Sequence, residues 1–402
     1  MAGYSEYKDS GIPWIGKIPS HWDVKPIRSF LSQSKELNAD ENATLLTLSQ
    51  YKGVNIRIGN EDSSISAAES LIGYNVVHKG QFVMNIMLAW NGSYGVSDYD
   101  GVISPAYAIF NFKDSVCKAF YHYLWRTKAY QDAFKSRSKG IVDSRLRLYP
   151  QYFLPFYTSI PPIEEQEAIV EYLDTVTADI NNAIAAKERI IAALEERRKI
   201  IITHAVTRGV NTDVPMRDSG IDWLGEIPAS WNICKVKTVA IISHGSDPVK
   251  NGDIPVYGSG ANSFRTCGEY KEGPAVLLGR KGATLHIPHY IEGKYWNVDT
   301  AFDVKVDDQR FNLRYFYYLA MCFDYDRYKT QTTLPSMTQS SYANICIPFP
   351  PLEEQVKIVR YLDGENQRYN EVRSQQMNLI ELLRERKNII INETVTGKVK
   401  VI

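Results

Sequence analysis

Apolar and polar residues follow one another along this chain in the same order twice. In each half, a short apolar run precedes a stretch of alternating apolar and polar residues, and both patterns predict β-strands. Aromatic residues at helical spacing then predict a helix, which is followed by a polar loop and a last apolar strand. The strands, helix and loop are expected at 81–84, 106–112, 119–125 and 136–144 in the first half, and at 275–278, 301–306, 314–320 and 330–341 in the second. Each half therefore contains a mixed domain of helices and strands.

A long charged helix is predicted at the end of each half, over 162–208 and 351–396. Pro162 and Pro351 suit a first helical position, and the glutamates that follow complement the positive end of the helix dipole. A heptad pattern runs through both helices, so we expect them to pack against each other within the chain, with pairing between chains as the alternative. The seam positions are Ile180, Ala183, Lys187, Ile190, Leu194, Arg197 and Ile201 in the first helix, and Tyr369, Val372, Gln376, Leu379, Leu383, Arg386 and Ile390 in the second.

The two halves also share sequence. Residues 9–22 (DSGIPWIGKIPSHW) return as 218–231 (DSGIDWLGEIPASW), and PPIEEQ at 161–166 returns as PPLEEQ at 350–355. The offsets are 209 and 189, so the second middle region is 20 residues shorter than the first. The predicted boundaries are a first domain at 1–158 with its opening segment at 7–23, a first long helix at 159–209, a second domain at 210–347 with its opening segment at 216–232, and a second long helix with a tail at 348–402.

These patterns together predict an α+β fold. Two globular mixed α/β domains stand in a tandem pseudo-repeat and are joined by the two long helices. The opening segments are rich in glycine, proline and tryptophan, which predicts packed, non-helical lead-ins. Trp22 and its copy Trp231 are expected to anchor these segments to the body of each domain.

Composition narrows the class of protein. Lysine and arginine total 46 and aspartate and glutamate also total 46, which by itself argues against a nucleic-acid partner. The charge is unevenly distributed, however, because 126–147 holds seven basic residues against Asp132 and Asp143. There is no apolar run long enough to span a membrane and no secretory signal, and five cysteines without a C-x-x-C motif favour reduced thiols in a cytoplasm.

No catalytic arrangement is visible in the sequence. Gly11 to Lys17 has the spacing of a phosphate-binding loop, but Ile18 replaces the Mg²⁺-binding hydroxyl and Glu226 replaces the lysine in the second copy. His286 and His289 form the one tight histidine pair, without cysteines or carboxylates to complete a metal site. We therefore expect a protein that is not an enzyme and holds no metal.

Basic residues interleaved with aromatic and amide side chains are the positive signal, because such side chains can reach phosphates or base edges. They follow corresponding strands and loops of the two halves, which favours DNA reading over a merely solvated loop. A two-lobed protein-binding scaffold without DNA contact remains the alternative, and a free-standing DNA enzyme is a third reading that lacks its catalytic residues. The candidates are Asn85, Trp90, Asn91, Arg137, Lys139, Arg145, Arg147, Arg280, Lys281 and Thr284.

The doubled opening segment, the doubled PPIEEQ helix and the run Gly101–Tyr107 (GVISPAY) resemble the specificity subunits of type I restriction-modification enzymes. The resemblance implies that 24–158 and 233–347 are target recognition domains, each reading one half of a split site on double-stranded DNA. It implies that the long helices lie antiparallel as a coiled coil, space the two domains and dock two modification (methyltransferase) subunits. The helix residues that match are Glu165, Gln166, Leu194, Glu354, Gln355 and Leu383.

The same resemblance implies that restriction motor-nuclease subunits join the complex. S-adenosylmethionine, ATP and Mg²⁺ would then belong to the partner subunits and not to this chain. Because the two middle regions differ in sequence, the two half-sites should differ and enclose an unread gap. Lengthening a helix should lengthen that gap without changing either half-site.

Overall fold

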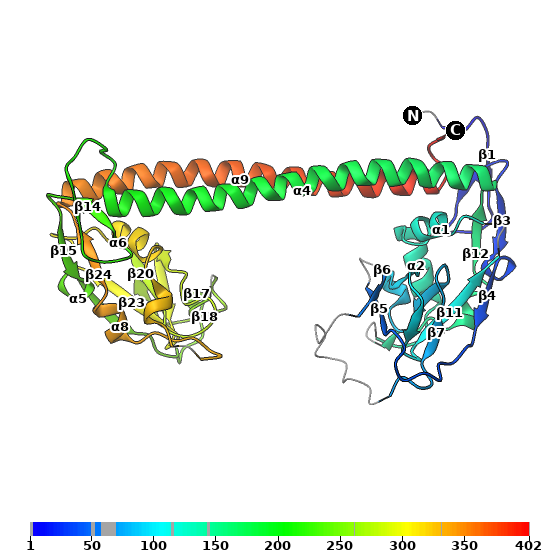
Figure 1. Cartoon of the computed structure of the whole chain (residues 1–402), viewed down its shortest axis with the longest axis horizontal. Coiled ribbons are helices and arrows are strands. Elements are labelled where there is room, and N and C mark those ends of the chain that lie inside the picture. Colours follow the sequence, from blue (N-terminus) through cyan, green and yellow to red (C-terminus); the bar gives the residue numbers. More distant parts are fainter. Residues whose placement is uncertain are drawn as a thin grey trace. The chain divides into compact units, whose positions relative to one another are not determined.

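The computed structural model describes residues 3–49, 53–57, 70–113, 116–142, 145–260, 262–330 and 332–401. The chain forms two compact units. Unit 1 comprises residues 1–185 and 379–402, and unit 2 comprises 186–378. Both long helices pass from one unit into the other, so each unit holds a globular body and one stretch of each helix (Figure 1). No helix in the described ranges is both long and apolar enough to cross a membrane.

A four-stranded antiparallel sheet forms the centre of unit 1. Its strand order is β4-β11-β8-β9, and it consists of β4 (Leu31–Ser34), β11 (Tyr107–Phe112), β8 (Phe82–Asn85) and β9 (Tyr94–Val96). Every residue of β8 is buried, which explains why this strand is a continuous apolar run rather than an alternating one. Two smaller antiparallel pairs flank the sheet: β5 (Leu46–Ser49) with β6 (Gly53–Ile56), and β7 (Asn75–Val77) with β10 (Gly101–Ile103).

Unit 2 repeats the central sheet in the same strand order, β16-β23-β20-β21. These strands are β16 (Ala240–His244), β23 (Ala301–Val306), β20 (Ala275–Gly279) and β21 (His289–Ile291). A second four-stranded sheet, found among the described residues in unit 2 only, runs in the order β18-β17-β22-β19. It contains β18 (Arg265–Cys267), β17 (Ile254–Tyr257), β22 (Lys294–Asn297) and β19 (Lys271–Glu272), with β17 and β22 parallel.

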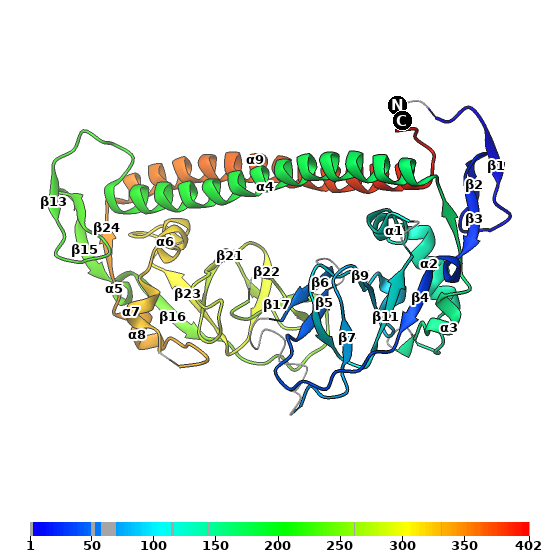
Figure 2. The same ribbon diagram turned by 45° about the vertical axis from the view of Figure 1, so that its right-hand side comes forward.

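The strands and short helices predicted from the sequence are confirmed within one or two residues. The predicted helices correspond to α1 (Lys118–Leu124) and α6 (Leu313–Ala320), and each lies between the central sheet and the long helices of its own unit (Figures 1 and 2). The further short helices are α2 (Lys128–Arg137), α3 (Pro150–Phe153), α5 (Val236–Val239), α7 (Tyr325–Tyr328) and α8 (Gln339–Ala343), with 3-10 turns η1 (Ile27–Ser29) and η2 (Ala89–Asn91).

The opening segments are non-helical, as expected. In unit 1 they form the pair β1 (Tyr7–Asp9) and β2 (Lys17–Pro19), then β3 (Asp23–Pro26) beside β12 (Tyr157–Ile160). In unit 2 the counterparts are β13 (Met216–Asp218) with β14 (Glu226–Pro228), and β15 (Asn232–Lys235) with β24 (Cys346–Phe349). Gly11 and Gly16 take the left-handed conformation, which glycine adopts without steric cost, and this closes the turn between β1 and β2.

The two long helices are α4 (Ile163–Arg208) and α9 (Leu352–Val395). In unit 1, Lys387 Nζ of α9 donates to Asn181 Oδ1 of α4 at 3.0 Å. In unit 2, Arg198 Nε of α4 donates to Asn366 Oδ1 at 2.6 Å, and Tyr369 OH donates to Glu195 Oε1 at 3.4 Å. Numbering rises along one helix as it falls along the other, so the pairing is antiparallel in both units.

The predicted heptad positions of the helix–helix seam are only partly correct. Ile180 and the half-buried Leu194 and Leu383 lie on the inner faces, but Ile190, Arg197, Val372, Leu379 and Arg386 are exposed. Buried or half-buried residues instead recur every 11 residues, some of them packed into the globular bodies, at Ile169, Ile180, Ile191 and Ile202 in α4 and at Ile358, Tyr369, Ile380 and Ile391 in α9. A heptad drifts by about 20° per repeat on a straight α-helix, so three repeats move the seam toward the next residue.

Candidate nucleic-acid interface

A buried tryptophan joins each opening segment to the start of a long helix. In unit 1, Trp22 is fully buried and its indole Nε1 donates to Glu165 Oε2 at 3.0 Å. In unit 2, Trp231 Nε1 donates to Glu354 Oε2 at 2.8 Å. Both glutamates also lie in the first turn of their helix, where a negative charge complements the dipole. The tryptophan of the repeated opening segment and the glutamate of the repeated helix motif therefore contact each other in both units.

The glutamine of each PP-x-EEQ motif makes a second repeated contact. Gln166 Oε1 accepts from the Cys117 backbone N–H at 3.0 Å, and its Nε2 donates to the Pro161 carbonyl at 2.8 Å. Gln355 Oε1 accepts from the Asn312 N–H at 2.7 Å, and its Nε2 donates to the Pro350 carbonyl at 2.9 Å. Each glutamine thus ties the start of a long helix to the start of the short helix beneath it, α1 or α6.

A tyrosine one turn along the short helix makes a third repeated contact. Tyr123 OH of α1 donates to Asp174 Oδ1 at 2.7 Å, and Tyr318 OH of α6 donates to Asp363 Oδ1 at 2.5 Å. We call the three contacts together the duplicated junction: tryptophan to glutamate, glutamine to backbone, and tyrosine to aspartate. It fixes the orientation of each globular body on its own stretch of helix.

The duplicated junction corrects one expectation from the sequence. Glu165, Gln166 and Gln355 are buried and Glu354 is half-buried, so these four side chains do not form an exposed docking surface. The physical reason is that their polar atoms are committed to internal hydrogen bonds, as buried polar groups must be. Leu194 and Leu383 also point to inner positions of the helix pair.

In unit 1, the predicted basic residues gather around the end of α2. Arg137 is the last residue of this helix rather than part of a loop, and Lys139 and Arg145 are exposed on the loop that follows. Arg147 is half-buried, and its guanidinium donates to the Leu146 carbonyl at 2.9 Å. Asp143 and residue 144 of the predicted loop lie outside the described residues, as does residue 331 of the corresponding loop in unit 2.

The amide and aromatic candidates of unit 1 are more internal than predicted. Asn85 is buried, and its Oδ1 accepts from the Met87 N–H at 3.0 Å, so its side chain stabilises the turn after β8. Trp90 Nε1 donates to the Met87 carbonyl at 3.1 Å, and the Lys135 ammonium lies 4.9 Å from the centre of its ring. Asn91 is half-buried in η2. Asn85 therefore has no surface on which to meet DNA.

In unit 2, Arg280, Lys281 and Thr284 follow β20 directly, as predicted. One guanidinium nitrogen of Arg280 donates to the Asp299 carbonyl at 3.1 Å, which fixes the direction of the side chain. Lys281 is exposed and forms a backbone bridge with Ser336. Thr284 Oγ1 donates to the Ser259 carbonyl at 2.7 Å. The loops at 258–260, 280–284 and 334–336 therefore meet in one polar surface.

Backbone hydrogen bonds show that the two candidate surfaces occupy equivalent places. Leu148 N donates to the Ile86 carbonyl at 2.9 Å in unit 1, and Met337 N donates to the Arg280 carbonyl at 2.9 Å in unit 2. Ile86 and Arg280 each directly follow the central strand, β8 or β20. The loop ahead of Leu148 therefore corresponds to the loop ahead of Met337, although their residues differ.

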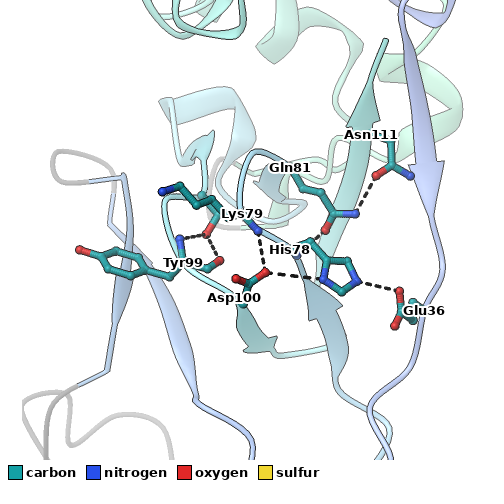
Figure 3. Close-up of polar contacts among 8 residues, drawn as sticks. Glu36, His78, Lys79, Gln81, Tyr99, Asp100 and Asn111 are labelled. Atoms are coloured by element: carbon teal, nitrogen blue, oxygen red, sulfur yellow. Dashed lines mark hydrogen bonds and ion pairs between the residues drawn. The ribbon is translucent and has the colours of Figure 1, made fainter. Parts of the chain in front are cut away.

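A polar cluster that the sequence analysis missed stabilises the turn between β7 and β8 (Figure 3). His78 Nε2 lies 3.0 Å from Glu36 Oε2, and His78 Nδ1 lies 3.6 Å from Asp100 Oδ1. Asp100 also accepts from the Lys79 N–H, and Gln81 Nε2 donates to Asn111 Oδ1 at 2.7 Å. The two ring nitrogens of His78 face carboxylates on opposite sides, which suits a structural bridge and not a single bound metal ion.

A second unpredicted feature is a groove of about 910 Å³ between α1, α2 and α9 within unit 1. His122 and Arg126 line it, and an Arg126 guanidinium nitrogen lies 3.0 Å from His122 Nδ1. Burial, followed by the positive charge of Arg126, lowers the pKa of His122 to about 3. His122 is therefore neutral at ordinary pH and accepts from Arg126. The sequence gives no signal for this groove, because nothing in it places α1 and α2 against α9.

Buried charge in unit 2 is likewise structural. Lys271 Nζ donates to Asp303 Oδ2 at 2.9 Å and to Asn297 Oδ1 at 2.7 Å, and Tyr295 OH donates to Asp303 Oδ1 at 3.0 Å. This network links the second sheet of unit 2 to its central sheet. Among the described residues, no group of three or more His, Cys, Asp or Glu side chains is placed to hold a metal ion.

Comparisons with known proteins point to one family. The model of the type I restriction modification DNA specificity domain matches residues 231–382. The chain is 22% identical to the type I restriction enzyme MjaVIII specificity subunit of Methanocaldococcus jannaschii, over 96% of this chain and 94% of that protein.

Two solved structures share the fold. A chain from a study of complex assembly and conformational transition of the type I R-M system has a TM-score of 0.72 at 15% identity, over 95% of this chain and 99% of its own. The HsdS subunit from Thermoanaerobacter tengcongensis has a TM-score of 0.50 at 14% identity, over 95% of this chain and 98% of its own. These similarities support the tandem α+β architecture with two long helices.

Proposed function

This chain belongs to the family of type I restriction-modification specificity subunits, and we propose that each of its two globular bodies reads one half of a bipartite, asymmetric DNA site. Specificity subunits are non-catalytic subunits that recognise DNA. We assign the recognition domains to 1–158 and 210–347 and the joining helices to 159–209 and 348–402. Each recognition domain offers its own set of basic residues to the duplex.

One observation carries this proposal: the duplicated junction has the same contacts in both units, whereas the candidate surfaces have different residues. Arg137, Lys139 and Arg145 supply the positive charge in unit 1, and Arg280 and Lys281 supply it in unit 2. Arginine and lysine donate to guanine edges and to phosphates, and different placements select different bases. Two unlike surfaces on one repeated support therefore favour two unlike half-sites over one palindromic site.

The long helices act in this proposal as spacer and docking surface. A helix of 46 residues is about 69 Å long at 1.5 Å per residue, whereas major grooves on one face of a duplex recur about every 34–36 Å. The exposed outer faces of α4 and α9 would receive two modification subunits, and restriction motor-nuclease subunits would join them. S-adenosylmethionine, ATP and Mg²⁺ would be bound by those partners.

Mapping of methylated bases in a cell that carries the chain with its modification subunit tests the proposal. We expect one motif with two different halves and a gap of fixed length. A variant in which Arg137, Lys139, Arg145 and Arg147 become alanine should relax the first half only. A palindromic motif, or relaxation of both halves at once, would contradict the assignment.

Salt dependence separates DNA reading from the protein-scaffold alternative. Binding that depends on phosphate contacts weakens linearly in log Kd with log salt concentration, because counterions are released. We expect the assembled complex to bind a duplex carrying its site and to lose affinity steeply with salt. A scaffold without DNA contact would show no salt-dependent binding to this duplex.

A further inference from the structure

In each unit, an exposed aliphatic side chain lies in the loop that precedes the last short helix, α3 in unit 1 and α8 in unit 2. In unit 1, Ile141 is fully exposed and Val142 is 51% exposed. In unit 2, Leu334 is 60% exposed. Single exposed apolar residues are common on protein surfaces and need no explanation. The same feature in equivalent loops of two divergent domains does need one.

Both loops are closed at their base by equivalent backbone contacts. Lys139 N donates to the Arg147 carbonyl, and Arg147 N donates to the Lys139 carbonyl, both at 2.8 Å. Thr330 N donates to the Ser336 carbonyl at 2.9 Å. In unit 1 the turn is also tight, because a Cβ on Gly140 would lie 2.5 Å from the Arg145 carbonyl oxygen. The described contacts therefore hold the base of each loop, from which Ile141 and Leu334 project.

Basic residues accompany both tips, although Asp143 belongs to the first loop and Arg280 pairs with Asp299 Oδ2 at 3.5 Å. Lys139 and Arg145 are exposed on the loop that carries Ile141, and the bridge between Lys281 and Ser336 brings a lysine to the loop that carries Leu334. Arg280 belongs to the same surface, since its carbonyl accepts from Met337 N. An exposed aliphatic side chain with basic residues on the same surface complements DNA, in which stacked bases are flanked by phosphates. Another protein's apolar surface would match the aliphatic tip without using the cations.

We propose, on the basis of the DNA-reading function above, that Ile141 and Leu334 are wedges that insert between stacked base pairs, one in each half-site. Ile and Leu side chains inserted at a base step partly unstack it and kink the duplex. Pyrimidine–purine steps such as TA and CA deform most easily, so each wedge selects such a step by its flexibility. The wedges thereby add sequence selection at a step that no hydrogen bond reads.

Fluorescence of 2-aminopurine tests the two wedges separately. The probe is a duplex carrying the mapped methylation site, with 2-aminopurine replacing one adenine at a time, excluding the adenines that are methylated. The protein is the full chain assembled with its modification subunits. We expect the wild-type complex to raise fluorescence at one step in each half-site. Ile141→Ala should abolish the rise in the first half-site only, and Leu334→Ala in the second only.

Each alanine variant should also bind the site-bearing duplex on the order of tenfold more weakly, with binding to unrelated duplex unchanged. Ile72→Ala is the matched control, because Ile72 is a 56% exposed aliphatic residue of unit 1 and follows Leu71, whose carbonyl accepts from Asn38 Nδ2 together with the Asp40 carbonyl. It should leave both fluorescence signals intact. Both wedge side chains are largely exposed, so their truncation removes little buried contact and the variants should fold.

Three results would overturn the proposal. Specific binding with no fluorescence rise at any tested step would exclude wedges while leaving the DNA-reading function intact. A rise that survives both alanine variants would assign unstacking to other residues. Loss of modification-subunit binding in Ile141→Ala, with the fluorescence signals unchanged, would identify the tip as a protein contact. Absence of specific binding by the wild-type complex would instead refute the DNA-reading function itself.

Discussion

The two units share the contacts that attach each globular body to the long helices, and they differ in the surface that the body presents. The duplicated junction recurs almost bond for bond, and the central sheets have the same strand order. Unit 2 then adds a second four-stranded sheet, where unit 1 has two separate strand pairs. Residues that orient the globular body are thus repeated, whereas residues on the candidate surface are not. Under the proposed function, the position of each body and the bases that it reads would therefore be encoded by separate sets of residues.

The junctions themselves differ in one respect. Glu165 accepts from Tyr4 OH and lies 2.8 Å from His21 Nε2, in addition to its bond with Trp22. Ser230 and Asp213 occupy the positions in unit 2 that correspond to His21 and Tyr4. Gly397, at the end of α9, completes the contact in unit 1, because a Cβ there would lie 3.0 Å from the Trp22 ring. Gly209 does the same for Trp231 in unit 2.

The largest expected effect comes from removing a junction tryptophan. Trp22→Ala should lower the free energy of unfolding of unit 1 by about 3–5 kcal/mol, because a buried indole leaves a cavity. Trp231→Ala should do the same for unit 2. Hydrogen exchange read separately over the two central sheets measures each effect. Equal loss of protection in both units from either variant would show that the long helices couple them, and the comparison would fail.

A smaller effect is expected from the arginines of the two surfaces. Arg145→Ala should weaken binding through the first half-site, and Arg280→Ala through the second, by about 1–3 kcal/mol if each arginine contacts a base. Competition binding with duplexes altered in one half-site measures the selectivity. Lys25→Ala is the control, because Lys25 pairs with Asp23 on β3 of the opening segment. Equal weakening on unrelated DNA would identify a phosphate contact instead.

The smallest expected effect concerns pH and again separates the units. The pKa of His122 is about 3 in the folded chain and near 6.5 when exposed, so the unfolded state binds the proton first. Unit 1 should therefore lose stability as pH falls from about 6.5 toward 3, and His122→Asn, which keeps an acceptor for Arg126, should reduce this loss. Tyr317 occupies the corresponding position of α6. Urea unfolding at pH 7 and 5 measures the slope, and an unchanged slope in the variant would refute the assignment.

The regular elements could be predicted because their patterns are local. The apolar run of β20 and the alternation in β23 require no knowledge of tertiary contacts. Helix α2 was missed because its buried residues Tyr130, Ala133 and Phe134 stand between basic residues, Lys128 before them and Lys135 and Arg137 after, that suggest a loop. The second sheet of unit 2 was missed because its strands are short and its parallel pair, β17 and β22, joins residues about 40 apart in the chain.

The candidate site shows the limits of residue type as a guide. Arg280 and Lys281 lie where the sequence placed them, directly after an apolar strand. Glu165 and Gln355 were misplaced, since charged and amide side chains are mostly exposed and only their partners reveal why these are buried. Ile141 and Leu334 could not be identified as candidates from the sequence, because a lone aliphatic residue in a polar loop belongs to no recognisable pattern.

The 11-residue recurrence along α4 and α9 restricts how this architecture can change. A stretch added to one long helix alone would shift every later side chain along its antiparallel neighbour, and a stretch far from a whole number of turns would also rotate it out of contact. Adding 11 residues to both α4 and α9 would keep their contacting faces together, and each addition would extend the helices by about 16.5 Å. Helix pairs of this architecture should therefore differ in length by close to whole turns, and the proposed half-sites should then be separated in corresponding steps.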